Sequence, residues 1–316
     1  MARHYPPLNA LLFFITAART LSFTRTAEEL FVTRSAVSRQ IKGLEDFLGT
    51  SLFKRAKSGL ELTPSGVSYS NALSLCFADI KLATDAILGC EGDGKFKLGL
   101  SATFNSTWLI GRLNRLHDLH PELAVAFVTN ALDTTEESVD FSSGEMDAAV
   151  RLGTGSWPGC QSDKLLDVHI QLVCAPELLT AARTGLSLPE IEQHPWLGYK
   201  HLPELWPNWL AKAGGDASAF ARKRVMAFDN VAVAVQAAVD GLGIIPMYRP
   251  LVDPLLDSGK LVVAHEFTML CDKAYYFVCP TSYATHKPTV MFRKWILAEA
   301  EEFMRRRPAL HCVHDP

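Results

Sequence analysis

Residues 26–45, TAEELFVTRSAVSRQIKGLE, contain two short amphipathic segments joined by the turn FVT at 31–33. The second segment predicts a helix over about residues 34–45, and Thr33 is its expected N-cap because a threonine hydroxyl can accept a backbone N–H at a helix start. Three apolar residues at the spacing of one helical face predict its buried stripe: Val37, Ile41 and Leu44. Such a pair of helices belongs either to a helix-turn-helix or to an ordinary core.

The opposite side of this predicted helix carries hydroxyls and cations over two turns, and no acid precedes Glu45. A solvated helix face usually mixes acids with bases, whereas hydroxyls and cations suit phosphate oxygens and base edges. The face therefore favours a DNA recognition helix over a solvated core helix. The residues expected to contact DNA from this helix are Thr33, Arg34, Ser35, Ser38, Arg39 and Lys42.

Two helices are expected before the one at 34–45: one over about 8–18, and one from about 22–24 to Leu30 that contains the first segment of the pair. After the third helix, LFKRAKSGLELT at 52–63 reads as two short strands around the turn 56–59. A basic hairpin at this place predicts a wing that contacts the DNA backbone through Lys54, Arg55 and Lys57. The alternative is a surface hairpin whose lysines only serve solubility.

The distribution of charge supports a DNA-binding head. The 316-residue chain has a net charge of −3, but residues 1–66 hold nine Lys/Arg against five Asp/Glu, a net charge of +4. The remainder therefore carries −7. A small basic head on a larger acidic body is typical of a chain with a DNA-binding module at one end.

The N-terminus and the cysteines indicate a cytoplasmic protein without a cofactor or metal. The basic start and the run LLFFI resemble a signal peptide, but Arg19 and helical apolar spacing favour a core helix. The chain has no apolar run long enough to span a membrane. Its seven cysteines form no CxxC and no zinc spacing, so Cys271 and Cys279 as a redox pair are less favoured than ordinary reduced thiols.

Residues 22–66, SFTRTAEELFVTRSAVSRQIKGLEDFLGTSLFKRAKSGLELTPSG, resemble the LysR-type transcriptional regulators, and most of all the branch of the glycine-cleavage and β-lactamase regulators. The resemblance extends more loosely along the whole chain. It implies dimers that associate into tetramers, a pseudo-palindromic double-stranded DNA site of the T-N11-A type and contact with RNA polymerase.

A long helix is expected after the wing, because Thr63-Pro64 is a typical helix start, Gly89 a typical stop, and Gly66 the one breaker between them. Its apolar residues follow steps of four and three, which is a heptad seam. We expect a dimer through this seam, and the alternative is packing on the chain's own domain. The residues expected to pair two copies are Leu73, Phe77, Ile80 and Ile87.

The remainder alternates predicted strands and helices, which indicates a mainly parallel α/β sheet. The expected fold is α/β overall, with a winged helix-turn-helix at 1–63, a linker helix at 64–90 and an effector domain at 91–316. That domain is expected to be two-lobed and to resemble periplasmic binding proteins, as LysR-type effector domains do. Lobe I comprises about 95–163 and 271–306, and lobe II about 164–270, with crossovers at about 163–168 and 265–271.

Ligands of open α/β sheets lie at the carboxyl ends of strands, near helix starts. The strand FKLGL is followed by a polar cluster of Ser101, Thr103, Asn105 and Ser106. Arg151 is a candidate cation for an anionic ligand or an interlobe ion pair. Helix capping is the alternative role for this cluster. The resemblance implies that Thr103, Asn230 and Tyr275 lie near effector-contacting positions. The expected effector residues are Ser101, Thr103, Phe104, Asn105, Asn130, Arg151, Tyr199, Phe228, Asn230 and Tyr275.

These patterns predict a DNA-binding regulator controlled by a small, anionic effector such as an amino acid, a carboxylate or a peptide fragment. The residues fit an activator and a repressor equally well. They also fit a dimer and a tetramer equally well. The alternative is a cytoplasmic two-lobed solute-binding protein or an enzyme on the same fold, with a non-functional DNA-binding head. The chain offers no carboxylate pair or nucleophile–base set that would assign an enzyme, and the loop GTGSWPG at 153–159 lacks the Lys-Ser/Thr of a P-loop.

Overall fold

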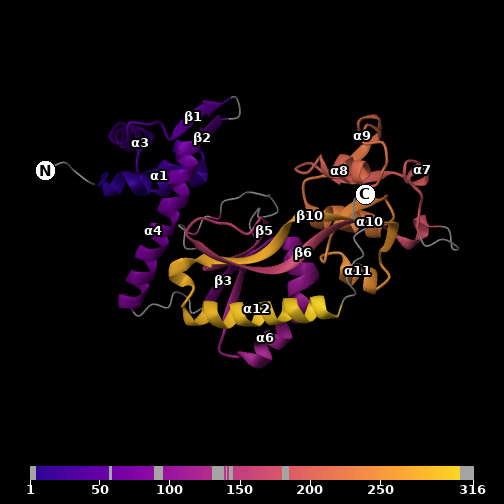
Figure 1. Ribbon diagram of the computed structural model, residues 1–316. Helices are drawn as coiled ribbons and strands as arrows, with labels where there is room; N and C mark the ends of the chain where they lie inside the picture. Colours follow the sequence, from indigo (N-terminus) through magenta and orange to yellow (C-terminus); the bar gives the residue numbers. More distant parts are fainter. Residues whose placement is uncertain are drawn as a thin grey trace.

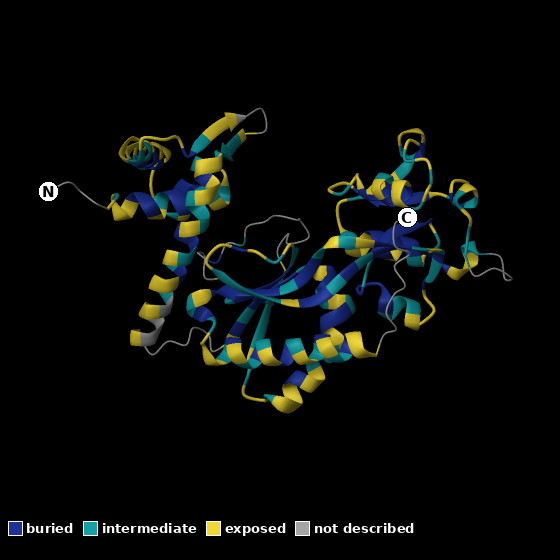
Figure 2. Cartoon of the chain, in the orientation of Figure 1, coloured by how far each residue is buried: buried dark blue, intermediate teal, exposed yellow. Residues whose placement is uncertain are grey.

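The computed structural model describes residues 5–56, 59–88, 95–129, 139, 141, 145–179 and 185–306. A small head of helices and a hairpin stands apart from a larger α/β body, and one long helix leads from the head to the body (Figure 1). Buried residues follow the inner faces of the head helices and the central sheet of the body (Figure 2).

The head contains three helices and a two-stranded hairpin, as predicted. The stripe of α3 is confirmed, because Val37, Ile41 and Leu44 are buried in one core with α1. Ser22 and Thr33 cap α2 and α3 by accepting the N–H of the third residue beyond each cap. The elements are α1 (Leu8–Thr20), α2 (Phe23–Glu29), α3 (Arg34–Leu48), β1 (Phe53–Ala56) and β2 (Gly59–Leu62).

The long helix α4 covers Pro64–Leu88, and the Thr63 hydroxyl caps it by accepting the N–H of Gly66 at 3.0 Å. The predicted apolar seam of α4 divides into two parts. Leu73 is buried in the head core and Phe77 packs against that core, so these two residues cover the chain's own domain. Ile80 and Ile87 are 60% and 86% exposed.

The seam expectation is therefore corrected for Leu73 and Phe77, because the head lies over the first half of α4 and covers their side of it. Another face of α4 meets the body: Ala78 is buried with Met146, Ala149 and Tyr283. A Cβ built on Gly159 would lie 2.0 Å from Leu75 Cδ1, so glycine there lets α4 approach closely.

One six-stranded sheet with the order β4-β3-β5-β10-β6-β9 runs through both lobes. The expectation of a mainly parallel sheet is wrong, because β10 runs antiparallel to β5 and β6, and β6 to β9, while only β3 is parallel to its neighbours β4 and β5. The chain enters lobe II along β6 and returns along β10, so these strands must run in opposite directions. The strands are β3 (Lys95–Gly99), β4 (Ala124–Val128), β5 (Ala148–Gly153), β6 (Cys160–Cys174), β9 (Ile245–Arg249) and β10 (Val262–Pro280).

Each lobe has its own hydrophobic core. In lobe I, α12 (Lys287–Arg305) packs along the sheet and buries Phe292, Trp295 and Ile296 (Figure 1). A run of helical turns follows β3 and continues to α6. The alternation of strands and helices also predicts a helix near 135–144, which lies largely outside the described residues. The turns are α5 (Ala102–Phe104), a π-helix (Asn105–Leu109), a 3-10 turn (Ile110–Arg112) and α6 (Leu113–Leu119).

In lobe II, α10 (Val231–Val239) packs against the parallel pair β7 (Trp196–Tyr199) and β8 (Val225–Phe228). Trp196 and Trp206 stack within this core, with ring centroids 4.3 Å apart. Helix α10 approaches α5 of lobe I, so the two lobes face each other there. The remaining helices are α7 (Leu188–Ile191), α8 (Leu205–Lys212), α9 (Ala219–Arg222) and α11 (Asp253–Asp257), with 3-10 turns at Pro176–Leu178 and Thr281–Tyr283.

Candidate nucleic-acid interface and ligand pocket

The hydroxyl and cationic side of α3 faces solvent. Thr33, its N-cap, accepts the N–H of Ala36 at 3.2 Å, and its hydroxyl lies 3.0 Å from that of Ser35. This local bonding fixes the first turn of α3 with its polar groups outward. The predicted helix residues Arg34, Ser35, Ser38, Arg39 and Lys42 are all exposed.

A groove of about 700 Å³ separates α3 from the wing. Four predicted DNA-binding residues line it together: Ser38, Lys42, Lys54 and Arg55. The Lys54 ammonium lies 3.3 Å from a Glu61 carboxylate oxygen across the hairpin, so the wing holds this cation on its surface. Lys57 lies outside the described residues. The groove therefore joins recognition-helix and wing cations along one surface.

Glu45 is a structural residue of this interface that the sequence reasoning did not identify. One of its carboxylate oxygens, Oε1, accepts the backbone N–H groups of Leu52 at 2.7 Å and Phe53 at 3.1 Å. These two bonds tie the start of the wing to the end of the acid-free face of α3. The sequence could have singled out Glu45 because it is the first acid on that face of the helix, seven residues before Leu52 at the start of the wing.

The turn between α2 and α3 also has an unusual residue. Phe31 has a φ of 54°, in the left-handed region that non-glycine residues rarely adopt, and its side chain is 96% exposed. This conformation reverses the chain within three residues and brings Thr33 to the start of α3.

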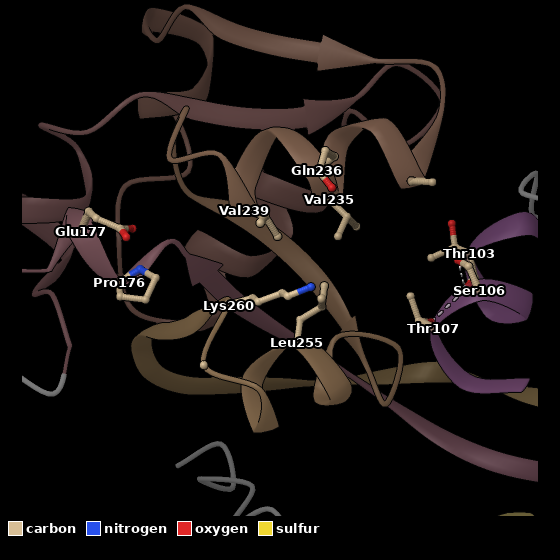
Figure 3. A pocket seen from close by; sticks show the side chains of 12 residues that line it. Thr103, Ser106, Thr107, Pro176, Glu177, Val235, Gln236, Val239, Leu255 and Lys260 are labelled. Atoms are coloured by element: carbon tan, nitrogen blue, oxygen red, sulfur yellow. Dashed lines mark hydrogen bonds between the residues drawn. The ribbon is translucent and has the colours of Figure 1, made fainter. Parts of the chain in front are cut away.

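A pocket of about 520 Å³ lies between the two lobes (Figure 3). Lobe I contributes hydroxyl side chains, and lobe II contributes one face of α10 together with the segments after β6 and α11. The volume falls in the range typical of small-molecule sites. The lining residues of lobe I are Thr103, Ser106 and Thr107, and the main ones of lobe II are Glu177, Val235, Gln236, Val239, Leu255 and Lys260.

Thr103 is the predicted effector residue that the structure brings into this pocket. It is 2% exposed, and its Oγ1 has no hydrogen-bond partner among the described residues. Ser106 and Thr107 donate their hydroxyl protons to the Thr103 carbonyl oxygen at 3.2 and 2.8 Å, so their own lone pairs remain as acceptors. A buried, unbonded hydroxyl is costly unless a ligand or water completes it.

The charged side chains in the pocket wall are Glu177 and Lys260, as far as the described residues show. Neither was identified from the sequence. Glu177 lies three residues after the end of β6, so its position at a strand end could have identified it as a pocket residue. Lys260 lies three residues after α11, and no local sequence signal identifies it as a pocket residue. The cation in this wall is therefore Lys260 and not Arg151.

Arg151 is 2% exposed in β5 and is not part of the pocket lining. Ala148 and Val150 point into the lobe I core, so strand alternation puts Arg151 on the other face, with Ala149. In the register of the sheet it lies opposite Tyr276. The expectation that Arg151 faces an effector is corrected for this pocket.

The expectation that Tyr199 contacts an effector is also corrected for this pocket. It is buried in the lobe II core, where its hydroxyl donates to the Pro246 carbonyl oxygen at 3.3 Å and approaches Met247 Sδ at 2.6 Å. Burial raises the pKa of its phenol well above the usual range. Its hydroxyl is therefore committed inside the lobe and does not reach the pocket.

The other predicted effector residues cap helices or pack in cores outside the pocket lining. Tyr275 packs against Phe104 in the lobe I core, with ring centroids 5.0 Å apart and ring planes tilted by 49°. Ser101 caps α5, and Asn230 caps α10 by accepting the N–H groups of Ala232 and Val233. Asn105 follows α5, Phe228 packs partly on the lobe II core, and Asn130 lies outside the described residues.

Two further properties concern the described part of the chain. No helix there is long and apolar enough to cross a membrane, and no group of three or more His, Cys, Asp or Glu side chains there could hold a metal ion. Cys271 and Cys279 are both free thiols, and burial raises the pKa of the Cys279 thiol to about 12. A thiol with so high a pKa stays protonated near neutral pH, which disfavours redox chemistry.

Comparison with known proteins identifies two matching segments of the chain. Residues 8–67 match the family model described as bacterial regulatory helix-turn-helix protein, lysR family, and residues 91–301 match the LysR substrate binding domain. A similar protein is the glycine cleavage system transcriptional activator of Escherichia coli K12, 34% identical over 300 residues that cover 95% of this chain and 96% of the relative. Another is the transcriptional activator AmpR of Pseudomonas aeruginosa, 36% identical over 77% of this chain and 79% of its own.

Solved structures show the same fold. The effector domain of AmpR from Pseudomonas aeruginosa matches with a TM-score of 0.56 at 24% identity, covering 67% of this chain and 97% of that domain. ArgP from Mycobacterium tuberculosis matches with a TM-score of 0.58 at 20% identity, covering 92% of this chain and 96% of its own.

Proposed function

The chain belongs to the LysR family of DNA-binding transcriptional regulators, and we propose that it reads DNA with the exposed face of α3 and the wing. The observation that carries this proposal is the acid-free face of Ser35, Ser38, Arg39 and Lys42, which is exposed and continuous with the groove beside the wing. Hydroxyls and cations on one helix face match the acceptor-rich edges and phosphates of a major groove. Lys54 and Arg55 then contact the flanking backbone.

A small molecule in the interlobe pocket controls this binding in our proposal. The pocket takes its walls from both lobes, so a ligand held by Thr103 on one side and by lobe II on the other favours one arrangement of the lobes. By linkage, a ligand that prefers one arrangement shifts the equilibrium toward it. The buried, unbonded Thr103 hydroxyl supports this role.

Self-association would place two heads on one DNA site. Ile80 and Ile87 are exposed apolar residues on the part of α4 beyond the head, and pairing them in a dimer removes both from water. Two-fold pairing then fits a pseudo-palindromic site of the T-N11-A type. Association into tetramers, contact with RNA polymerase and a cytoplasmic location complete the proposal. The alternative of a solute-binding protein or enzyme with a non-functional head is not favoured, since the head matches a DNA-binding family along its whole length.

A mobility-shift assay of the full chain on the DNA upstream of its own gene tests the proposal. With excess nonspecific DNA near physiological salt, we expect a discrete band that resists competition. A folded, oligomeric protein that gives no specific band on this DNA or on a library of genomic fragments would refute sequence-specific binding.

A further inference from the structure

The two charges in the pocket wall are of opposite sign and both belong to lobe II. Glu177 lies in the 3-10 turn after β6, and Lys260 follows Gly259 after α11. Within the described part of the chain neither side chain forms an ion pair, and the two do not pair with each other although they line one pocket. The wall therefore presents one unneutralised anion and one unneutralised cation to the same ligand.

The surface around these charges is apolar on lobe II and hydroxyl-bearing on lobe I. Val235, Val239 and Leu255 provide the apolar part. Figure 3 shows the Lys260 side chain running alongside Leu255 into the pocket, with the hydroxyls of Thr103 and Thr107 on the facing wall. A ligand that fills this space meets a positive group, a negative group, an aliphatic surface and a buried hydroxyl.

We propose that the effector is a zwitterion with an aliphatic part, an α-amino acid or a short peptide. Its carboxylate pairs with Lys260, its ammonium pairs with Glu177, and the Thr103 hydroxyl bonds a polar atom of the ligand from lobe I. This inference rests on the proposed role of the pocket as the effector site. It narrows the ligand class beyond a generic anion.

Electrostatic balance favours a zwitterion over ligands that carry a single charge. Glu177 and Lys260 are both exposed side chains of the pocket wall. A monocarboxylate would pair with Lys260 but bring a second negative charge into the pocket that already holds Glu177, and like charges repel. A simple amine would pair with Glu177 but bring a second positive charge into the pocket that already holds Lys260. A zwitterion satisfies both side chains at once, and both of its ionised groups are present near neutral pH.

Isothermal titration calorimetry of the full chain tests this, with L-leucine and L-leucyl-L-leucine as probes. Each probe is compared with its N-acetylated form, which lacks the ammonium, and its C-terminal amide, which lacks the carboxylate. We expect at least one of the two free zwitterions to bind, and each of its blocked forms to bind more weakly by about tenfold or more. Binding of L-leucine indicates a free amino acid as the effector, and binding of L-leucyl-L-leucine indicates a short peptide.

Variants that remove one charge test which side chain of the pocket binds the carboxylate of the ligand and which binds its ammonium. Lys260→Met should abolish the preference for the free carboxylate, and Glu177→Gln should abolish the preference for the free ammonium. Lys212→Met, at the end of α8 and outside the pocket lining, is the matched control and should leave both preferences unchanged.

Two results would overturn the zwitterion. One is equal affinity for a probe and its N-acetylated form in the unaltered protein, and the other is no binding heat from either free probe at millimolar concentration. A mobility shift on the same preparations separates this failure from failure of the regulator assignment, because Lys260→Met and Glu177→Gln lie far from the head and should retain the DNA complex.

Discussion

Removing the Glu45 carboxylate should release the wing from the recognition helix. In Glu45→Ala, the N–H groups of Leu52 and Phe53 lose their shared acceptor, which lies 2.7 and 3.1 Å away in the native chain. Leu52 is 1% exposed, so water compensates its N–H poorly, while the neighbouring Phe53 is half-buried. The wing base retains other hydrogen bonds from Thr63: its N–H donates to the Leu52 carbonyl oxygen at 2.9 Å, and its hydroxyl donates to the carbonyl oxygens of Ser51 at 2.8 Å and Leu52 at 3.3 Å.

An unsatisfied buried N–H costs about 1–3 kcal/mol, so the two together should lower the free energy of local wing opening by about 2–4 kcal/mol. Glu45→Gln keeps an acceptor oxygen but loses the charge. Since charge-assisted hydrogen bonds are about twice as strong as neutral ones, this variant should lose about half as much.

Amide hydrogen exchange at residues 52 and 53 measures this opening directly. We expect exchange at these amides in Glu45→Ala to accelerate by about two orders of magnitude, at about 1.4 kcal/mol per factor of ten. Asp46→Ala is the matched control: it removes the same charge one residue later on α3, where the carboxylate bonds no described residue. Equal exchange rates in the two variants would refute the anchoring role of Glu45.

Three further outcomes are expected. Arg39→Ala should weaken specific DNA binding by about 1–3 kcal/mol in a mobility shift, and unchanged affinity would remove Arg39 from the DNA contact. Ile80→Asp should lower the mass measured by light scattering without unfolding the chain. Leu73→Ala should lower the free energy of unfolding of the head by about 2–5 kcal/mol in urea. A wild-type mass for Ile80→Asp, or unchanged stability in Leu73→Ala, contradicts the division of the seam into a buried and an exposed part. Cys279, whose pKa burial raises to about 12, should react with iodoacetamide far more slowly than the exposed Cys76 when peptides are mapped by mass spectrometry; equal rates would show that Cys279 is not protected.

The features predicted well from sequence are those that depend on neighbours along the chain. The face of α3 follows from helical periodicity, its start from the hydroxyl of Thr33, and the wing from two short strands around a turn. Each depends on residues within about one or two turns of each other, so local geometry alone decides them. The alternating strands and helices of the body were predicted for the same reason.

The pocket was predicted far less well, because its walls come from segments far apart in the chain. Thr103 was found since a strand end and a helix start meet there. Lys260 reaches the same pocket only because α11 and α10 pack on one lobe, and Arg151 misses it because strand alternation turns its side chain to the other face of the sheet. A heptad spacing likewise shows that one side of α4 is apolar, but not what covers it.

The amino-acid sequence by itself determined the winged head, the long helix, the alternating strands and helices of the body and the cationic face of α3, because hydrogen bonding and hydrophobic periodicity act between residues that are close in the chain. Only the tertiary structure decided that Leu73 belongs to the head core while Ile80 remains exposed, that Glu45 holds the wing, and that Glu177 and Lys260 share one pocket. Those outcomes depend on which surfaces meet when the parts pack together, and the pattern of a single segment carries no information about its partner.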